Sequence, residues 1–205
     1  MLKMLKRLHS EQQGITGLET AIILIAFVVV ASVFAYTVLS AGIFSSQKGK
    51  EAINSGLEQT RATMALVGGI TAKDTDSDSD VDQLIFTIAN ALDGEAIDLT
   101  TTSDADADGI LSDEATKSHK TIISYTASSQ QINDITWTKT QMGKGDSDNL
   151  LEPGEKFEIT VVLTAVTPVL DAYDTFRLEV RPDKGSTLTI ERTVPAKVDA
   201  VIDLN

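Results

Sequence analysis

The fold is decided by one stretch of the sequence, residues 15–47, which reads ITGLETAIILIAFVVVASVFAYTVLSAGIFSSQ. Its only charged residue is Glu19. A helix needs about 20 apolar residues to cross a hydrocarbon core of about 30 Å, and this stretch is long enough. Apolar residues would cover every face of such a helix, so we expect it to be buried in lipid or in other protein.

The helical pattern continues beyond the apolar stretch, although charged residues now appear in it. Ile53, Leu57 and Met64 recur near one helical face, and Gly68-Gly69 is expected to end the helix. The sequence therefore predicts one helix over residues 15–67, about 80 Å long at 1.5 Å per residue. A globule made from a chain of 205 residues cannot bury such a rod alone. The helix needs a membrane or further copies of the chain.

A short basic segment, MLKMLKRLHSEQQG, precedes the helix as residues 1–14. The formal net charge of the chain is −13; this segment carries +2, which leaves −15 on the remainder. A basic start on an acidic chain is typical of a targeting segment. An ordinary secretory signal is cut after its apolar stretch, near small residues. Here the small residue Gly14 comes before the apolar stretch.

The carboxylate of Glu19 needs a partner, because an isolated charge is costly in lipid or in a dry protein core. A cut after Gly14 would free the α-amine of Ile15, four residues from Glu19. That amine, on the same or on a neighbouring subunit, can neutralise the carboxylate. The helix macrodipole also favours a negative charge in the first helical turns.

From residue 68 to residue 205 the pattern changes to short β-branched runs separated by Gly, Asp and Ser. Along one run, Phe157, Ile159 and Val161 alternate with polar residues, as expected for a half-buried strand. Candidate strands lie at residues 84–89, 96–101, 121–127, 134–138, 156–167, 175–181 and 186–194. We therefore predict an α+β protein, a long N-terminal hydrophobic α-helix followed by an immunoglobulin-like antiparallel β-sandwich that forms an outer domain.

The composition argues against several classes of function. A pI of about 4.4 does not suit nucleic-acid binding, which needs clustered Lys and Arg. The chain has no cysteine, and its two histidines, His9 and His119, lie far apart in sequence. Thiol nucleophiles are therefore absent, and the chain has few residues from which a histidine metal site or a catalytic triad could be formed. We expect no enzyme and no catalytic residue.

One acidic segment, residues 104–112, reproduces the first nine positions of a calcium loop, with glycine at the sixth. The twelfth position of such a loop is normally Glu, but here it is Ala115. Calcium or another divalent cation is therefore a candidate cofactor, and the alternative is a solvated acidic turn. The expected ligands are Asp104, Asp106, Asp108, Ile110 through its carbonyl, and Ser112.

A second acidic segment, residues 74–82, places five carboxylates in nine positions. Such a run is more often a charged surface loop or linker than a metal site. We keep it as a weaker candidate for a cation. The residues concerned are Asp74, Asp76, Asp78 and Asp80.

The leader junction and the helix together resemble those of an archaellin, the archaeal flagellin. The resemblance rests on Gly14 as the last leader residue and on Gly17 and Glu19 as the third and fifth residues after the cut. It also rests on the run LETAIILIAFVVVASVFAYTVLSAGIFSSQKGKEAI, residues 18–53. The outer segment DNLLEPGEKFEITVVL, residues 148–163, is similar to archaellin outer domains more loosely.

The resemblance implies a class III signal peptide, shared with type IV pilins, that a prepilin-type leader peptidase cuts between Gly14 and Ile15. It implies a subunit that is inserted in the cell membrane and then assembled by an ATPase-driven machine. The product would be an extracellular homopolymeric filament used for swimming. Two alternatives stay open: an adhesion pilin or pseudopilin, and a monomeric membrane-anchored β-domain that binds a ligand and keeps residues 1–14.

Overall fold

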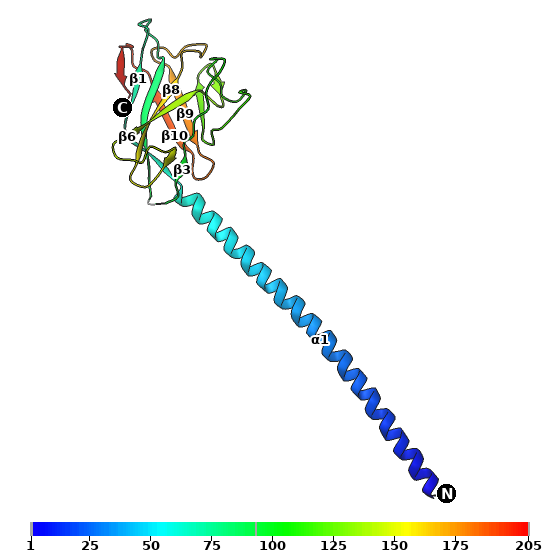
Figure 1. The fold of residues 1–205 in the computed structure, drawn as a ribbon. Helices are drawn as coiled ribbons and strands as arrows, with labels where there is room; N and C mark the ends of the chain where they lie inside the picture. Colours follow the sequence, from blue (N-terminus) through cyan, green and yellow to red (C-terminus); the bar gives the residue numbers. More distant parts are fainter. Residues whose placement is uncertain (1, 93, 205) are drawn as a thin grey trace. The chain divides into compact units, whose positions relative to one another are not determined.

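The structure, a computed structural model, describes the backbone of residues 2–92 and 94–204, and the side chains of these residues from position 17 onward. The chain divides into two compact units, one up to Asn54 and one from Ser55 onward. Helix α1 runs from Leu2 to Arg61, so its last two turns belong to the second unit (Figure 1). The second unit also contains all the described strands.

Helix α1 ends earlier than the sequence predicted, at Arg61 and not at residue 67. Strand β1, Met64–Lys73, begins where the helix was expected to continue, and it pairs with β2, Gln83–Asn90. Met64 had fitted a helical face, but it is a core residue of the sheet, 5% exposed. Pairing with a distant strand thus overrides the local helical pattern. The predicted stop at Gly68-Gly69 is a bulge within β1, where Gly68 has a φ of 85°.

Most of the remaining strands lie close to the predicted runs. They are β2, β4 (Ile122–Ala127), β8 (Lys156–Val162), β9 (Thr175–Arg181) and β10 (Leu188–Thr193). Two others differ in extent, because β3 covers only Ile97–Asp98 and β6 covers Trp137–Met142. Three were not predicted, since runs of two or three residues give no periodic signal: β5 (Gln131–Ile132), β7 (Leu150–Leu151) and β11 (Val201–Asp203).

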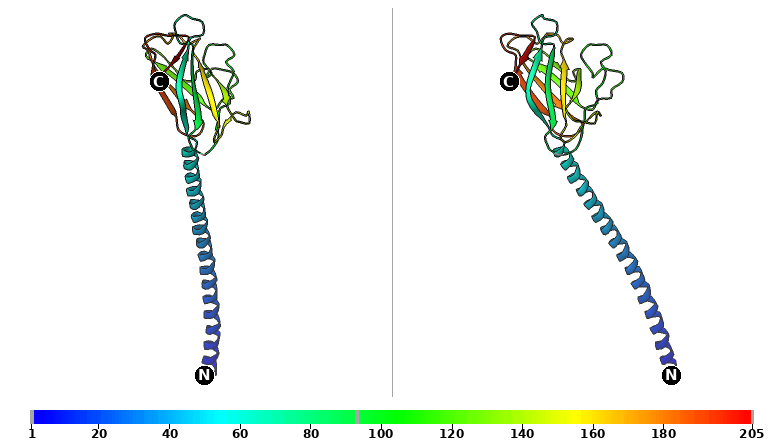
Figure 2. Two further views of the ribbon diagram at one scale, coloured as in Figure 1. Left: turned by 90° about the vertical axis from the view of Figure 1, so that its left-hand side faces the viewer. Right: turned by 60° about the vertical axis from the view of Figure 1, so that its left-hand side comes forward.

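The strands form two antiparallel sheets that face each other. One sheet has the order β11-β1-β2-β8-β6 and the other the order β10-β9-β4-β5, while β3 and β7 form a small separate pair. Figure 2 shows β1, β2 and β8, coloured from cyan to yellow, side by side in one layer and the orange strands in the other. The predicted antiparallel β-sandwich is confirmed.

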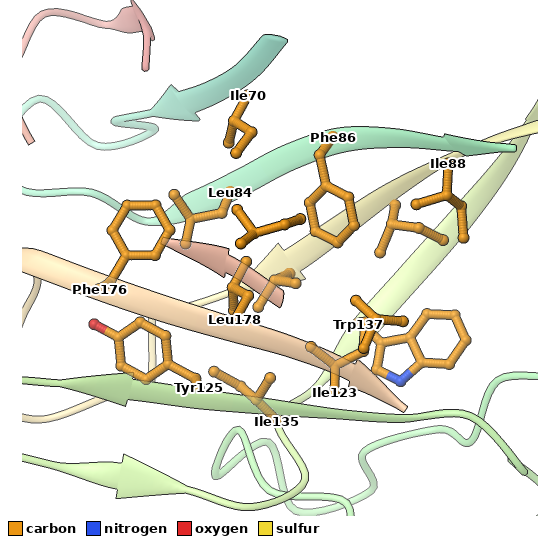
Figure 3. Close-up of a cluster of buried hydrophobic side chains, with 14 of the residues drawn as sticks. Ile70, Leu84, Phe86, Ile88, Ile123, Tyr125, Ile135, Trp137, Phe176 and Leu178 are labelled. Atoms are coloured by element: carbon orange, nitrogen blue, oxygen red, sulfur yellow. The ribbon is translucent and has the colours of Figure 1, made fainter. Parts of the chain in front are cut away.

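The core lies between the two sheets and follows the alternation in the sequence. Phe86 from β2 and Ile159 from β8 point inward, each 1% exposed. Figure 3 shows the inward side chains of β1 and β2 across from those of β4 and β9. Burying each large apolar side chain stabilises the fold by about 1.5–3 kcal/mol. The labelled members of this cluster are Ile70, Leu84, Phe86, Ile88, Ile123, Tyr125, Ile135, Trp137, Phe176 and Leu178.

Candidate functional site: an uncovered apolar helix and two acidic loops

The side chains of α1 that the structure describes before Ser55, from residue 17 onward, are all uncovered. Every residue from Gly17 to Asn54 is exposed, including large apolar side chains such as Phe27 and Tyr36. Soluble monomers rarely expose contiguous apolar patches larger than a few hundred Å². This surface is therefore built to be covered by other molecules.

The helix suits an apolar environment in its details as well. The segment Gly17–Arg61 is long and apolar enough to cross a membrane, with a mean hydropathy of 2.8 in its best window. Hydroxyl groups within it bond to the helix itself: Ser32 Oγ donates to Val28 O at 2.7 Å, and Thr37 Oγ1 donates to Phe34 O at 2.8 Å. Lipid or neighbouring helices can therefore surround these residues without leaving the two donors unpaired.

One hollow on α1 could receive a side chain from a neighbouring helix. It has a volume of about 320 Å³, is open to the outside, and has the aromatic residues Tyr36 and Phe44 in its lining. Packed helices interlock in this way, with the side chains of one helix entering the grooves of the next. The hollow is lined by Tyr36, Leu39, Ser40, Ile43, Phe44 and Gln47.

The predicted leader junction lies within α1, but the side chains of Gly14 and Ile15 are outside the described residues. Gly17 has open space around it, with no atom within 4 Å of where a Cβ would lie. Glu19 is exposed and forms no ion pair within the part of the chain whose side chains are described. Its carboxylate is thus available to a partner from outside that part.

The predicted calcium loop brings three carboxylates together. Oxygen atoms of Asp104, Asp106 and Asp108 lie within 4.8 Å of one another. The sequence offered no carboxylate at position twelve of the loop, but Glu114 folds back toward its start. Glu114 Oε1 accepts a hydrogen bond from the backbone N–H of Ala105 at 2.6 Å. By sequence spacing alone, Glu114 is the eleventh residue of the loop, one position before the usual glutamate.

Asp104 anchors this loop to the sandwich. Its carboxylate accepts hydrogen bonds from the N–H of Ala107 at 2.7 Å, from the N–H of Gly109 at 3.0 Å and from Thr136 Oγ1 at 2.7 Å. Burial raises the pKa of the Asp104 carboxyl, but these hydrogen bonds outweigh burial and lower it. A negative charge is thus held at the first loop position.

The other two predicted ligands lie further along the same loop. Ile110 donates its N–H to Asp108 Oδ1 at 2.8 Å, and its backbone forms an isolated bridge with Ile135. Ser112 is exposed, and its carbonyl accepts a hydrogen bond from Lys117 Nζ. The structure therefore brings the three aspartates together most closely and leaves Ser112 at the solvent edge.

The second acidic segment folds in the same way as the first. Asp74 accepts hydrogen bonds from the N–H groups of Ser77 at 2.6 Å and Ser79 at 3.1 Å, three and five residues ahead, the offsets that Asp104 uses. Ser77 and Ser79 have positive φ angles of 69° and 75°. The sequence did not reveal this likeness, because serine occupies the position where the first loop has glycine.

The second loop contains a carboxylate that sequence reasoning did not select. Asp82 is 6% exposed, and it lies with Asp76 and Asp80 in a group whose oxygens are within 4.8 Å of one another. Burial, together with the neighbouring Asp78 and Asp82, raises the pKa of Asp80 to about 6. A divalent cation would relieve this repulsion.

A buried polar cluster lies at the base of the first loop and was not indicated by the sequence. It consists of Thr102, His119 and Asp134, whose side chains bond to one another in that order. In the sequence, His119 is distinguished only as a histidine far from His9. No spacing pattern marks such a cluster, because its members come from three separate segments of the chain.

Comparison with known proteins gives one consistent result. The family model described as archaeal-type flagellin matches residues 14–192. The chain is 37% identical to "Probable flagellin 1" of Archaeoglobus fulgidus, covering 97% of this chain and 98% of that protein. It is 34% identical to "Probable flagellin 2" of the same organism, covering 93% of each.

A solved structure agrees with these sequence matches. The archaeal flagellum of Methanospirillum hungatei strain JF1 aligns with a TM-score of 0.63 at 28% identity, covering 92% of this chain and 99% of that one. The similarity extends over the helix and the sandwich alike. Because the family match spans most of the chain, this protein belongs to the archaeal-type flagellins.

Proposed function

We propose that α1 is the polymerising element of this flagellin, and that it moves from the cell membrane into the filament core once residues 1–14 have been removed. As an archaeal-type flagellin, the chain is a structural subunit of the archaeal flagellum filament used for motility, and not an enzyme. The observation that carries the proposal is the continuous exposure of apolar residues from Gly17 to Asn54.

The apolar surface of α1 can be kept from water both before and after this transfer. In the membrane, lipid covers the helix; in the filament, neighbouring copies of α1 replace the lipid, so one apolar environment is exchanged for another. Keeping this surface out of water is worth about 25 cal/mol per Å² in either place. Contacts between different faces of identical subunits do not close on themselves, so they generate an open helical filament outside the cell.

We propose that a prepilin-type leader peptidase cuts between Gly14 and Ile15. The order of a basic segment, then Gly14, then the apolar helix supports this cut. The family match gives further support, since it begins at Gly14. After the cut, the new α-amine of Ile15 on the same or a neighbouring subunit would neutralise Glu19, which has no ion pair among the described side chains.

N-terminal sequencing of the native protein tests the proposal most directly. We expect the mature chain to begin at Ile15 and to be recovered from filaments that electron microscopy resolves. A chain that begins at Met1, or after Ala41 as an ordinary secretory cut would leave it, rules out this maturation route. Recovery of a solitary detergent-soluble protein would rule out polymerisation through α1.

A further inference from the structure

We infer that two loops of the sandwich form a socket for the last two turns of α1, and that Gly94 and Gly185 are positioning residues for filament assembly. The inference rests on the proposed role of α1 as the polymerising element. The socket lies entirely within the second compact unit, which begins at Ser55.

The joint between helix and sandwich has almost no free linker. Ala62 follows α1 directly, donates its N–H to Glu58 O at 3.1 Å and is completely buried. Thr63 O accepts a hydrogen bond from the N–H of Ala91 at 2.7 Å, and Thr63 forms a parallel bridge with Ser186. Both residues between α1 and β1 are therefore held by the sandwich.

The turn between β9 and β10 forms one wall of the socket. Gly185 has a φ of 107°, and a Cβ there would lie under 3.0 Å from the carbonyl oxygen of Ala62. Gln59 Nε2 donates a hydrogen bond to Gly185 O, and Lys184 Nζ lies 3.9 Å from Glu58 Oε2. Glycine is needed here for both its backbone conformation and its small size.

The segment after β2 forms a second wall. A Cβ at Gly94 would lie under 3.0 Å from the carbonyl carbon and oxygen and from the Cβ of Arg61. Two loops from distant parts of the sequence thus approach the helix end so closely that neither has room for a methyl group. Such contacts restrict rotation about residues 62 and 63, so the outer domain moves with the last turns of α1.

This coupling matters for assembly because each subunit must present its outer domain at one angle to its own helix end. If the joint were loose, neighbouring outer domains would collide or fail to meet as helices packed. The chain provides a matched control for this idea. Gly154 has a similar φ of 90° but has nothing within 4 Å of a Cβ, so Gly154→Ala adds the backbone strain without the clash.

The socket can be measured directly by spin-label distances in the full chain in detergent micelles. The chain has no cysteine, so cysteines introduced at the exposed positions Ser55 and Thr189 are the only labelling sites. We expect a narrow distance distribution in the otherwise unchanged chain and in Gly154→Ala. We expect Gly185→Ala and Gly94→Ala to widen it at least about two-fold. A broad distribution in the parent chain, or an unchanged one in both socket variants, overturns the inference.

Folding and assembly are checked separately. Fluorescence of the buried Trp137 reports whether each variant still folds its sandwich. If a glycine variant does not fold, Gln59→Ala is measured in its place, because this exposed substitution removes the hydrogen bond to Gly185 O. Filament yield should fall about ten-fold or more in the socket variants and stay at the parent level in Gly154→Ala. A parent-level filament yield from variants whose distance distribution has widened overturns the assembly role. Failure of the parent chain to polymerise would contradict the proposed function. The spin-label distances do not depend on polymerisation, so they would still test whether the socket exists.

Discussion

His119 Nε2 lies 3.0 Å from Asp134 Oδ2, and both side chains are almost completely buried, at 4% and 7% exposure. On the other side of the ring, Nδ1 lies 2.6 Å from Thr102 Oγ1. That oxygen already accepts the N–H groups of Ser118 and His119, so its hydroxyl hydrogen is directed at Nδ1, and Nε2 is the ring nitrogen that donates to Asp134. The imidazole thereby fastens both ends of the Asp104 loop to the sandwich.

Replacing His119 with alanine should destabilise the outer domain strongly. The substitution leaves the Asp134 carboxylate buried without its partner, which costs about 3 kcal/mol of unfolding free energy. Chemical denaturation of the detergent-solubilised chain, followed by Trp137 fluorescence, measures this loss. Asp199→Asn, which breaks an exposed ion pair with Lys197, is the control and should change stability by less than about 0.5 kcal/mol. A loss below about 1 kcal/mol in His119→Ala contradicts the prediction.

Asp98 should make the domain sensitive to acid. Burial raises the pKa of Asp98, but hydrogen bonds from Lys120 and Thr100 outweigh burial and bring it to about 2, below the usual 3.8. A carboxyl with a lowered pKa in the folded state stabilises above about pH 4 and loses that contribution as the pH falls toward 2. We expect about 1–2 kcal/mol, allowing for the solvent around Lys120. The unfolding free energy of Asp98→Asn, measured between pH 7 and pH 2, should fall less steeply with decreasing pH than that of the parent chain. The same pH dependence in both proteins would refute this role.

Asp80 should have the opposite effect on the pH dependence. Its pKa is raised to about 6, so between about pH 4 and pH 6 the folded state binds a proton that the unfolded state has released. Stability therefore falls as the pH rises through this window and stays lower above it. Asp80→Asn should be more stable than the parent chain at pH 7 and lose the dependence over this window. Equal melting temperatures of the two proteins at pH 7 would show that Asp80 carries no such strain.

Calcium binding by the two acidic loops stays a prediction, which a titration can test. A ligand that binds only the folded state at about 100 times its Kd adds about 2.7 kcal/mol to the unfolding free energy. We expect calcium chloride to raise the melting temperature, and EDTA to reverse the rise. Asp106→Asn and Asp76→Asn should each remove part of the effect, because one carboxylate is lost from each loop. The Asp199→Asn control should respond like the parent chain; no response to millimolar calcium in any of them would make both loops ordinary acidic turns.

Glu19→Ala should separate membrane insertion from assembly. Removing the charge makes the helix more apolar, so insertion should be unaffected. Filament yield should fall at least about ten-fold, because the Ile15 amine would lose its partner after the cut. Glu51→Ala is the matched control, since Glu51 is also on α1 but pairs with Lys48 at an exposed site. Parent-level filament yield from Glu19→Ala would refute the proposed pairing.

Local pattern in the sequence was enough to predict the apolar helix, its need for cover, and the strands with several alternating residues. A charge-free run and a two-residue alternation are properties of neighbouring residues, so they can be recognised in the sequence without knowledge of the fold. The same holds for the residues 14–19 that led to the archaellin resemblance.

The tertiary structure decided the features that depend on residues far apart in the chain. Met64 belongs to a strand because β2 is there to pair with it, although its spacing suited a helix. Glu114 reaches its loop by folding back, and Gly185 is a glycine because Ala62 lies against it. His119 meets Asp134 only once the two segments that carry them, which lie outside the strands, are packed together. Periodicity records which face of an element is apolar, whereas pairing, hydrogen bonding and close approach are set by which elements become neighbours.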